Sequence, residues 1–204
     1  MCGVIGYYNK GTLDLELVSR LFSQSKIRGK HAYGIYDGKS VQKSLKLSEI
    51  MERVKVGSKF MIGHCRYSTS GDFRVLDNNQ PVVSNSVVSV FNGVISMKTK
   101  ECMESEFGFK LSNDNDGEVF NHNVAQGTES NFIESYPCSF AGLYAYQGEL
   151  FAIRNLNRPL WYGILNQSIY VASTKDIFKR AKFHGEIEQF KPCTKYRLSE
   201  LSHT

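Results

Sequence analysis

Short apolar stretches that are rich in Val, Ile, Tyr and Phe recur along the chain and are typical of β-strands. They cover residues 2–8, 59–68, 86–96, 139–154 and 160–173. Each of the last two contains a turn signal between two apolar runs, Gln147-Gly148 in one and Asn166-Gln167 in the other. We therefore expect two antiparallel hairpins or a meander towards the C-terminal half.

Other segments carry apolar residues at helical spacing. Two amphipathic stretches consist of Leu13, Leu15, Leu17, Val18, Leu21 and Phe22, and of Leu47, Ile50, Met51 and Val54. Shorter helical patterns lie near residues 99–107, 117–125, 128–136 and 175–183, with Ser173 and Thr174 as N-cap candidates for the last. Strands that pair antiparallel, with helices grouped between them, predict an α+β fold.

The composition is that of an ordinary soluble globular protein. The 204 residues are 41% hydrophobic and 22% charged, which allows a sizeable core and excludes a disordered or fibrous chain. No linker, repeat or low-complexity tract is visible, so we expect residues 1–204 to form a single domain. The net charge of +5 is scattered, whereas nucleic-acid-binding proteins concentrate basic residues on one face, so nucleic acid is not an expected partner.

Signals for secretion, membrane insertion and cofactor binding are absent from the sequence. The N-terminus lacks a signal peptide, and no run approaches the ~20 apolar residues of a membrane span. The five cysteines include no C-x-x-C pair, so neither a disulfide framework nor a zinc site is indicated. No glycine-rich phosphate-binding motif is present. We expect a cytoplasmic protein that makes no membrane contact, and the sequence predicts neither a cofactor nor a metal site.

Cys2 has the most distinctive chemistry in the chain. Its small side chain leaves Met1 open to aminopeptidase removal, which would make the cysteine N-terminal. A free α-amino group has a pKa of about 7.7–8.0 and a thiol one of about 8.5, so the amine can take the thiol proton near neutral pH. Such a nucleophile needs no separate histidine. The simpler alternative is a small buried cysteine in a strand.

Polar clusters that accompany Cys2 make the catalytic interpretation stronger. In the first half they are Cys2-Gly3, Arg28-Gly29, the segment 63–69, the segment 78–81, Asn92-Gly93 and the segment 116–118. In the second half Ser139-Phe140-Ala141, Arg154, Arg158-Pro159-Leu160, Gly163 and Ala172-Ser173 follow. In order and spacing the chain resembles, over nearly its whole length, the class II glutamine amidotransferase domain, a family of N-terminal-nucleophile hydrolases. The resemblance implies a four-layer αββα sandwich, with two antiparallel sheets between helical layers.

The resemblance also implies hydrolysis of L-glutamine to glutamate and ammonia. Cys2 would attack the side-chain amide and form a γ-glutamyl thioester, while Asn92 and Gly93 would donate hydrogen bonds to the oxyanion. Taken alone, Asn-Gly is equally typical of a hairpin turn. Because the match ends within a few residues of Thr204, we expect the ammonia to pass to a synthase on a separate chain.

Three further residues are expected to bind the substrate. Arg66 offers a planar guanidinium to the α-carboxylate of glutamine, and Asp116 offers a carboxylate to its α-ammonium. Thr69 would add a contact at the carboxylate end. The simpler alternatives are ordinary salt bridges for the two charged residues and strand propensity for Thr69.

The chain departs from the family pattern at a few positions. His31 stands where an acid is common, so the role of the loop that begins at Arg28 is open, and Phe91 precedes Asn92 where a histidine is frequent. His64 is interpreted as a structural strand histidine. Two other functions stay open, namely hydrolysis of a γ-glutamyl amide conjugate and a catalytically silent regulatory module.

Overall fold

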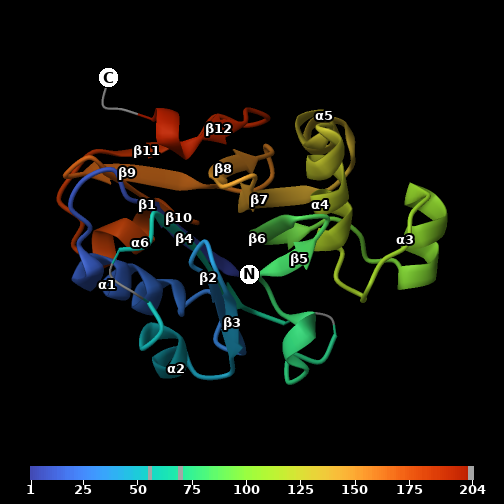
Figure 1. Ribbon diagram of the computed structural model, residues 1–204, viewed down its shortest axis with the longest axis horizontal. Helices are drawn as coiled ribbons and strands as arrows, with labels where there is room; N and C mark the ends of the chain where they lie inside the picture. The colour runs from blue at the N-terminus through green and yellow to red at the C-terminus, as the bar shows by residue number, and fades with distance from the viewer. Residues whose placement is uncertain (55–56, 69–70, 202–204) are drawn as a thin grey trace.

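The computed structural model describes residues 1–54, 57–68 and 71–201. Within these ranges the chain forms a seven-stranded and a five-stranded antiparallel sheet (Figure 1). In spatial order the larger sheet consists of β11 (Ile187–Gln189), β9 (Trp161–Leu165), β10 (Ser168–Ala172), β1 (Gly3–Tyr8), β4 (Phe60–Arg66), β2 (Ala32–Tyr36) and β3 (Val41–Ser44). The smaller sheet consists of β12 (Tyr196–Arg197), β8 (Glu149–Arg154), β7 (Ser139–Tyr146), β6 (Val87–Val94) and β5 (Val82–Ser84).

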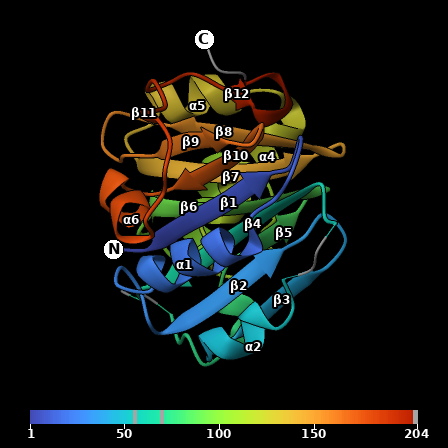
Figure 2. The same ribbon diagram turned by 90° about the vertical axis from the view of Figure 1, so that its left-hand side faces the viewer.

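Helices cover the outer face of each sheet. The larger sheet carries α1 (Leu15–Ser25), α2 (Leu47–Met51) and α6 (Lys175–Arg180), and Figure 2 shows α1 lying across its strands. The smaller sheet carries α4 (Gly117–Gln126), with α5 (Glu129–Ser135) and α3 (Lys100–Phe107) beside it. The predicted α+β fold, a helix–sheet–sheet–helix sandwich, is confirmed. None of the described helices is long and apolar enough to cross a membrane.

Alternating side chains along the strands account for these layers, because successive residues of a strand face opposite sides of a sheet. In β1, Val4 and Tyr8 belong to the apolar cluster between the sheets, whereas Ile5 and Tyr7 belong to the cluster beneath the helices. A third cluster fills the space between the smaller sheet and its helices. Every layer boundary is therefore closed by apolar residues.

Polar residues replace apolar ones on the inner faces at one end of the sandwich. In β4 the apolar Ile62 is followed at alternate positions by His64 and Arg66. In β6, Asn92 lies two residues after Val90, and Cys2 lies two residues before Val4 of β1. Strands β1 and β4 are adjacent and antiparallel, with Val4 opposite His64. The same alternation that builds the core thus places these polar side chains together where the core ends.

The predicted strands and helices are found with small changes at their ends. Both hairpins form, and all four residues of their turns, 147–148 and 166–167, have positive φ between 51° and 76°, as tight hairpin turns require. The second amphipathic helix ends at Met51 instead of continuing to Val54. Thr174 occupies the N-cap of α6 without a side-chain hydrogen bond to the helix. The other candidate, Ser173, lies outside the cap, and its Oγ accepts from the Val4 N–H at 2.7 Å.

Strands β2 and β3 and the short strands β5, β11 and β12 are absent from the sequence-based prediction. Residues 32–35 belong to a strand instead of the loop that the family motif suggested. Gly34 is the reason that the pattern is hard to recognise. A side chain at this position would collide with the backbone of Gln80, which lies directly against it. The glycine interrupts the apolar pattern of β2 and permits a close approach that only the folded chain reveals.

Candidate active site

A cavity of about 420 Å³ opens at the polar end of the sandwich. The residues that line it include Cys2, His64, Arg66, Asn78, Gly93 and Asp116. The fold thus brings together four of the predicted site residues, Cys2, Arg66, Gly93 and Asp116, and a fifth, Asn92, contacts Cys2 directly. Thr69 lies outside the described residues.

Cys2 is held at the start of β1 by contacts to its backbone and its thiol. Its backbone nitrogen donates to Oδ1 of Asn92 at 3.1 Å, and Nε of Arg28 donates to its carbonyl oxygen at 2.8 Å. The Tyr67 N–H donates to Sγ at 3.4 Å. Burial raises the pKa of the Cys2 thiol, although the Tyr67 hydrogen bond and the nearby positive charges oppose the increase. The thiol therefore needs a base to become a nucleophile at neutral pH.

Asn92 lies inside β6, where it pairs with Ala141 of β7. The Asn-Gly pair is therefore part of a strand, and the alternative of a hairpin turn is excluded. Asn92 is only 2% exposed, and its Nδ2 has no hydrogen-bond partner in the described part of the chain. An unsatisfied buried donor is costly. The side chain whose oxygen binds the Cys2 nitrogen thus keeps its NH2 group available as a donor.

Gly93 lines the cavity, and its backbone N–H points away from β7. Val94 donates across to β7, to Ser139 Oγ at 3.1 Å, whereas Phe91 donates in the opposite direction, to Gln80 Oε1 at 2.6 Å. Because N–H groups alternate in direction along a strand, the Gly93 N–H points away from β7, as that of Phe91 does. A side chain on Gly93 would collide with the Ser139 carbonyl oxygen, so this position requires glycine.

The Arg66 guanidinium faces the cavity from the end of β4. Its Nη1 donates to the Asn78 carbonyl oxygen and to Oδ1 of Asn79, the latter at 2.7 Å. Asn79 is buried, and its Nδ2 donates to the Phe73 carbonyl oxygen at 2.8 Å. Burial lowers the pKa of Arg66. Asn79 is thus a positioning residue that the sequence marked only as part of a polar cluster.

Asp116 faces the cavity from the position directly before α4. Its Oδ2 accepts from the backbone N–H groups of Ile95 at 2.7 Å and Ser96 at 3.1 Å. Burial raises the pKa of the Asp116 carboxyl, and these two donors oppose the increase. The carboxylate also acts electrostatically on Arg66. The cavity is therefore lined by groups of both charges, namely Arg66 and Lys98 on the cationic side and Asp114 and Asp116 on the anionic side.

The segment after α1 supports this site. From the sequence alone this segment had no assigned role. Gly29 lies against the backbone of Cys65 and Arg66 so closely that no side chain fits. The His31 ring stacks on Tyr67, with centroids 5.2 Å apart, and its Nδ1 accepts from the Ser68 N–H at 2.9 Å. His31 thus orders the end of β4 in place of the acid common in the family pattern.

His64 lines the cavity but is almost completely buried, consistent with its interpretation as a structural histidine. It is 1% exposed, and neither ring nitrogen has a hydrogen-bond partner within the described ranges. Burial, reinforced by the charge of Arg66, lowers the pKa of His64 to about 3. The ring is therefore neutral at neutral pH.

This low pKa predicts a loss of stability in acid. The unfolded chain protonates His64 near pH 6.5 and the folded chain only near pH 3, so stability is complete above pH 6.5 and falls as the pH approaches 3. At pH 4.5 the cost is about 2–3 kcal/mol, at about 1.4 kcal/mol per pH unit. Urea denaturation measures the free energy of unfolding at pH 7 and at pH 4.5. Between these two pH values His64→Gln should lose less of it than the wild-type chain, by about 2–3 kcal/mol. Equal losses in both proteins would contradict the prediction.

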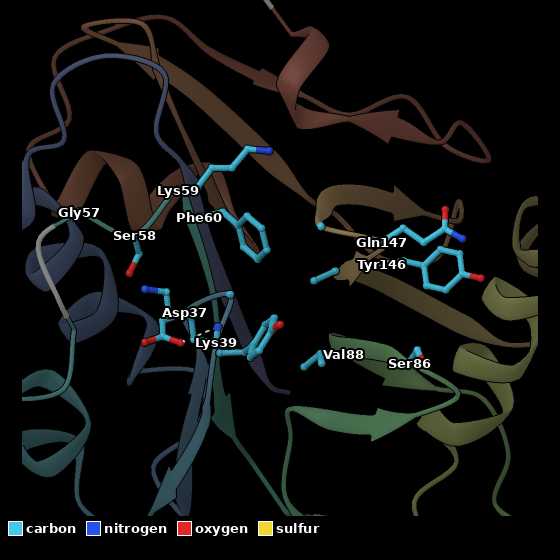
Figure 3. A pocket seen from close by; sticks show the side chains of 14 residues that line it. Asp37, Lys39, Gly57, Ser58, Lys59, Phe60, Ser86, Val88, Tyr146 and Gln147 are labelled. Atoms are coloured by element: carbon cyan, nitrogen blue, oxygen red, sulfur yellow. Dashed lines mark hydrogen bonds between the residues drawn. The ribbon is translucent and has the colours of Figure 1, made fainter.

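A second cavity, of about 400 Å³, lies at the opposite end of the sandwich (Figure 3). Phe60 and Val88 line it from the two sheets, and the charged residues Asp37, Lys39 and Lys59 line it as well. Nζ of Lys59 is paired with Glu149 at 3.0 Å. None of the predicted site residues that the structure describes lines this cavity.

Comparison with known proteins gives matches among solved structures alone. No protein-family model matches the chain, and no curated protein matches it. The glutamine phosphoribosylpyrophosphate amidotransferase from B. subtilis, complexed with ADP and GMP, superposes with a TM-score of 0.71 over 98% of this chain and 50% of its own, at 19% identity. A structure described as the allosteric regulatory enzyme of purine biosynthesis gives a TM-score of 0.72 over the same shares, at 20% identity.

A shorter protein has the same fold over most of its length. The glutamine aminotransferase class-II domain protein from Silicibacter pomeroyi superposes with a TM-score of 0.55 over 94% of this chain and 92% of its own, at 12% identity. The chain spans half the length of the first two structures. At these identities the matches establish the fold. The chain therefore shares the fold of these structures, the four-layer αββα sandwich of the class II glutamine amidotransferase domain that the sequence predicts.

Proposed function

We propose that this chain is a glutamine amidotransferase domain that hydrolyses L-glutamine to glutamate and ammonia through a γ-glutamyl thioester on Cys2. The observation that carries the proposal is the contact between Asn92 Oδ1 and the Cys2 nitrogen. The proposal is supported by the unpartnered Nδ2 of Asn92, and by the cavity that Cys2 lines together with Arg66 and Asp116. A nucleophile, an oxyanion donor and a pair of opposite charges are the groups that cleavage of a free amino acid amide requires.

Removal of Met1 converts the Cys2 nitrogen into the base of the reaction. The α-amine accepts the thiol proton, and Sγ attacks the glutamine side-chain carbonyl carbon. Asn92 Nδ2 and the Gly93 N–H stabilise the resulting oxyanion. The α-ammonium then returns its proton to the amide nitrogen, the C–N bond breaks, and ammonia leaves a γ-glutamyl thioester.

Hydrolysis of the thioester completes the cycle. The α-amine takes a proton from a water molecule, which attacks the thioester carbonyl, and the same two donors hold the second oxyanion. Collapse of this intermediate breaks the C–S bond and releases glutamate. The thiol regains its proton from the α-ammonium.

Opposite charges select glutamine at its other end. The Arg66 guanidinium, oriented by Asn79, binds the α-carboxylate. Asp116 binds the α-ammonium. This contact stabilises the ionised form of the Asp116 carboxyl, whose pKa burial would otherwise raise. Thr69 is proposed to add a contact at the carboxylate end.

The ammonia is proposed to serve a synthase on a separate chain. The described cysteines are all free, as is usual for proteins of a reducing compartment, which supports the expected cytoplasmic location. A silent regulatory module would need neither an unsatisfied buried donor at Asn92 nor two opposite charges in one cavity, so it is the weaker alternative.

The proposal is tested on the purified full chain by intact mass and by product release. We expect a mass without Met1 and the release of glutamate and ammonia in equal amounts from glutamine. L-Asparagine, which is one methylene shorter and cannot bring its amide to Cys2 while both charges are bound, should not be cleaved. A chain that lacks Met1 and releases neither product would overturn the proposal.

A further inference from the structure

Two arginine side chains from distant parts of the sequence meet at Met1. Nη2 of Arg28, which follows α1, and Nη1 of Arg158, which precedes β9, each donate to the Met1 sulfur at 3.6 Å. Arg28 also donates through Nε to the Cys2 carbonyl oxygen at 2.8 Å. The two guanidinium groups therefore flank the residue that is bonded to the Cys2 nitrogen.

The charges of these two arginines are not compensated by protein carboxylates. Across residues 1–54, 57–68 and 71–201, no acidic side chain forms an ion pair with either guanidinium. Burial lowers the pKa of Arg28, and the like charge of Arg158 contributes to the decrease. Nε of Arg158 is buried and has no hydrogen-bond partner in the same ranges.

Such a pair is suited to an anion. Buried charges and donors cost free energy unless they are paired, and a thioether sulfur is only a weak acceptor. Two guanidinium forks that converge on one point match the oxygens of a carboxylate, with charge-assisted hydrogen bonds. Met1 therefore occupies a place that is better suited to a carboxylate group.

The reaction determines which part of a substrate reaches this place. The amide nitrogen that leaves must accept its proton from the Cys2 nitrogen, so it lies on the side of Cys2 from which Met1 extends. A substituent on that nitrogen then enters the space that Met1 vacates. Arg28 and Arg158 face this space, whereas Arg66 and Asp116 belong to the cavity that receives the glutamyl half.

We propose that Arg28 and Arg158 form a carboxylate-binding subsite for the leaving amine, so that the site accepts γ-glutamyl amides of amino acids in addition to glutamine. This inference rests on the proposed function and extends its substrate class. The chemistry is unchanged: the γ-amide C–N bond breaks, the amine departs with the proton from the Cys2 α-ammonium, and water releases glutamate from the thioester.

The test compares γ-glutamylglycine with γ-glutamylglycinamide, two amides of nearly equal size of which only the first carries a carboxylate on its amine half. The full chain, shown by intact mass to lack Met1, should cleave γ-glutamylglycine with a kcat/KM higher by about tenfold or more, as expected for charge-assisted hydrogen bonds. In Arg158→Gln this ratio should fall to about one. Arg180→Gln, which removes an exposed arginine paired with Asp176 in α6, should keep the wild-type ratio.

The outcomes separate the subsite from the proposed function. Cleavage of glutamine together with equal kcat/KM values for the two glycine amides in the wild-type chain would overturn the subsite alone. A wild-type preference that Arg158→Gln retains would also overturn it. Failure of the Met1-free chain to cleave any of the three amides would overturn both proposals. The wild-type ratio requires no variant, so the test stands even if Arg158→Gln does not fold.

Discussion

Replacing Cys2 with alanine is expected to lower kcat/KM for glutamine by at least about 10⁴-fold, the scale on which loss of a nucleophile acts. No neighbouring thiol can substitute. Cys65 follows in the adjacent strand, but it is fully buried in the cluster beneath α1, and burial raises its pKa far above the ordinary thiol value. The glutamine analogue 6-diazo-5-oxo-norleucine should add one adduct to the wild-type chain and none to Cys2→Ala.

Cys102→Ala is the matched control for this experiment. Cys102 is an exposed thiol in α3 that lies outside the cavity, so a reagent that alkylated thiols by exposure would modify it first. We expect this variant to retain both the adduct and glutamine hydrolysis. An adduct on Cys2→Ala, or hydrolysis by that variant near the wild-type rate, would show that the nucleophile is another residue.

Much of the fold is predictable because the strands at its centre carry long, local signals. The two sides of the hairpin β7–β8 are apolar runs joined at Gln147-Gly148, and both features are visible in the sequence. β2 lacks such a signal. Its Gly34 is explained by contact with Gln80, a residue that is distant in sequence, and no local pattern encodes a contact of this kind.

The candidate site also contains residues that the sequence predicts and contacts that only the folded chain reveals. Cys2, Arg66 and Asp116 stand out in sequence because their chemistry and order follow a family pattern, and the fold places them in one cavity. The orientation of Arg66 by Asn79 depends on how the segment before β5 folds back. The convergence of Arg28 and Arg158 exists only after both sheets have formed. These contacts join residues whose local sequences carry no sign of their partners.

Asn92 is expected to show the second-largest effect, because it combines two roles. Its Oδ1 fixes the Cys2 nitrogen, and its Nδ2 is the buried donor available to the oxyanion. Asn92→Asp keeps an oxygen for the Cys2 nitrogen but replaces the donor with a negatively charged acceptor where negative charge develops. We expect kcat to fall by about 10²–10³-fold, roughly 3–4 kcal/mol of transition-state stabilisation, as for loss of one oxyanion donor. Asn92→Ala, which removes both contacts, should lose at least as much.

A control must separate this effect from damage to the buried core. Asn121 in α4 is equally buried, and its Nδ2 donates to the carbonyl oxygens of Val82 and Val87, away from the cavity. Asn121→Ala should therefore reduce the free energy of unfolding by about 1–3 kcal/mol, since it leaves buried acceptors unpaired, while kcat stays near the wild-type value. Ammonia release and urea denaturation on the same preparations measure the two quantities. If Asn92→Asp lost stability but kept its kcat, Asn92 would act as a structural anchor of β1 and the oxyanion donors would have to lie elsewhere.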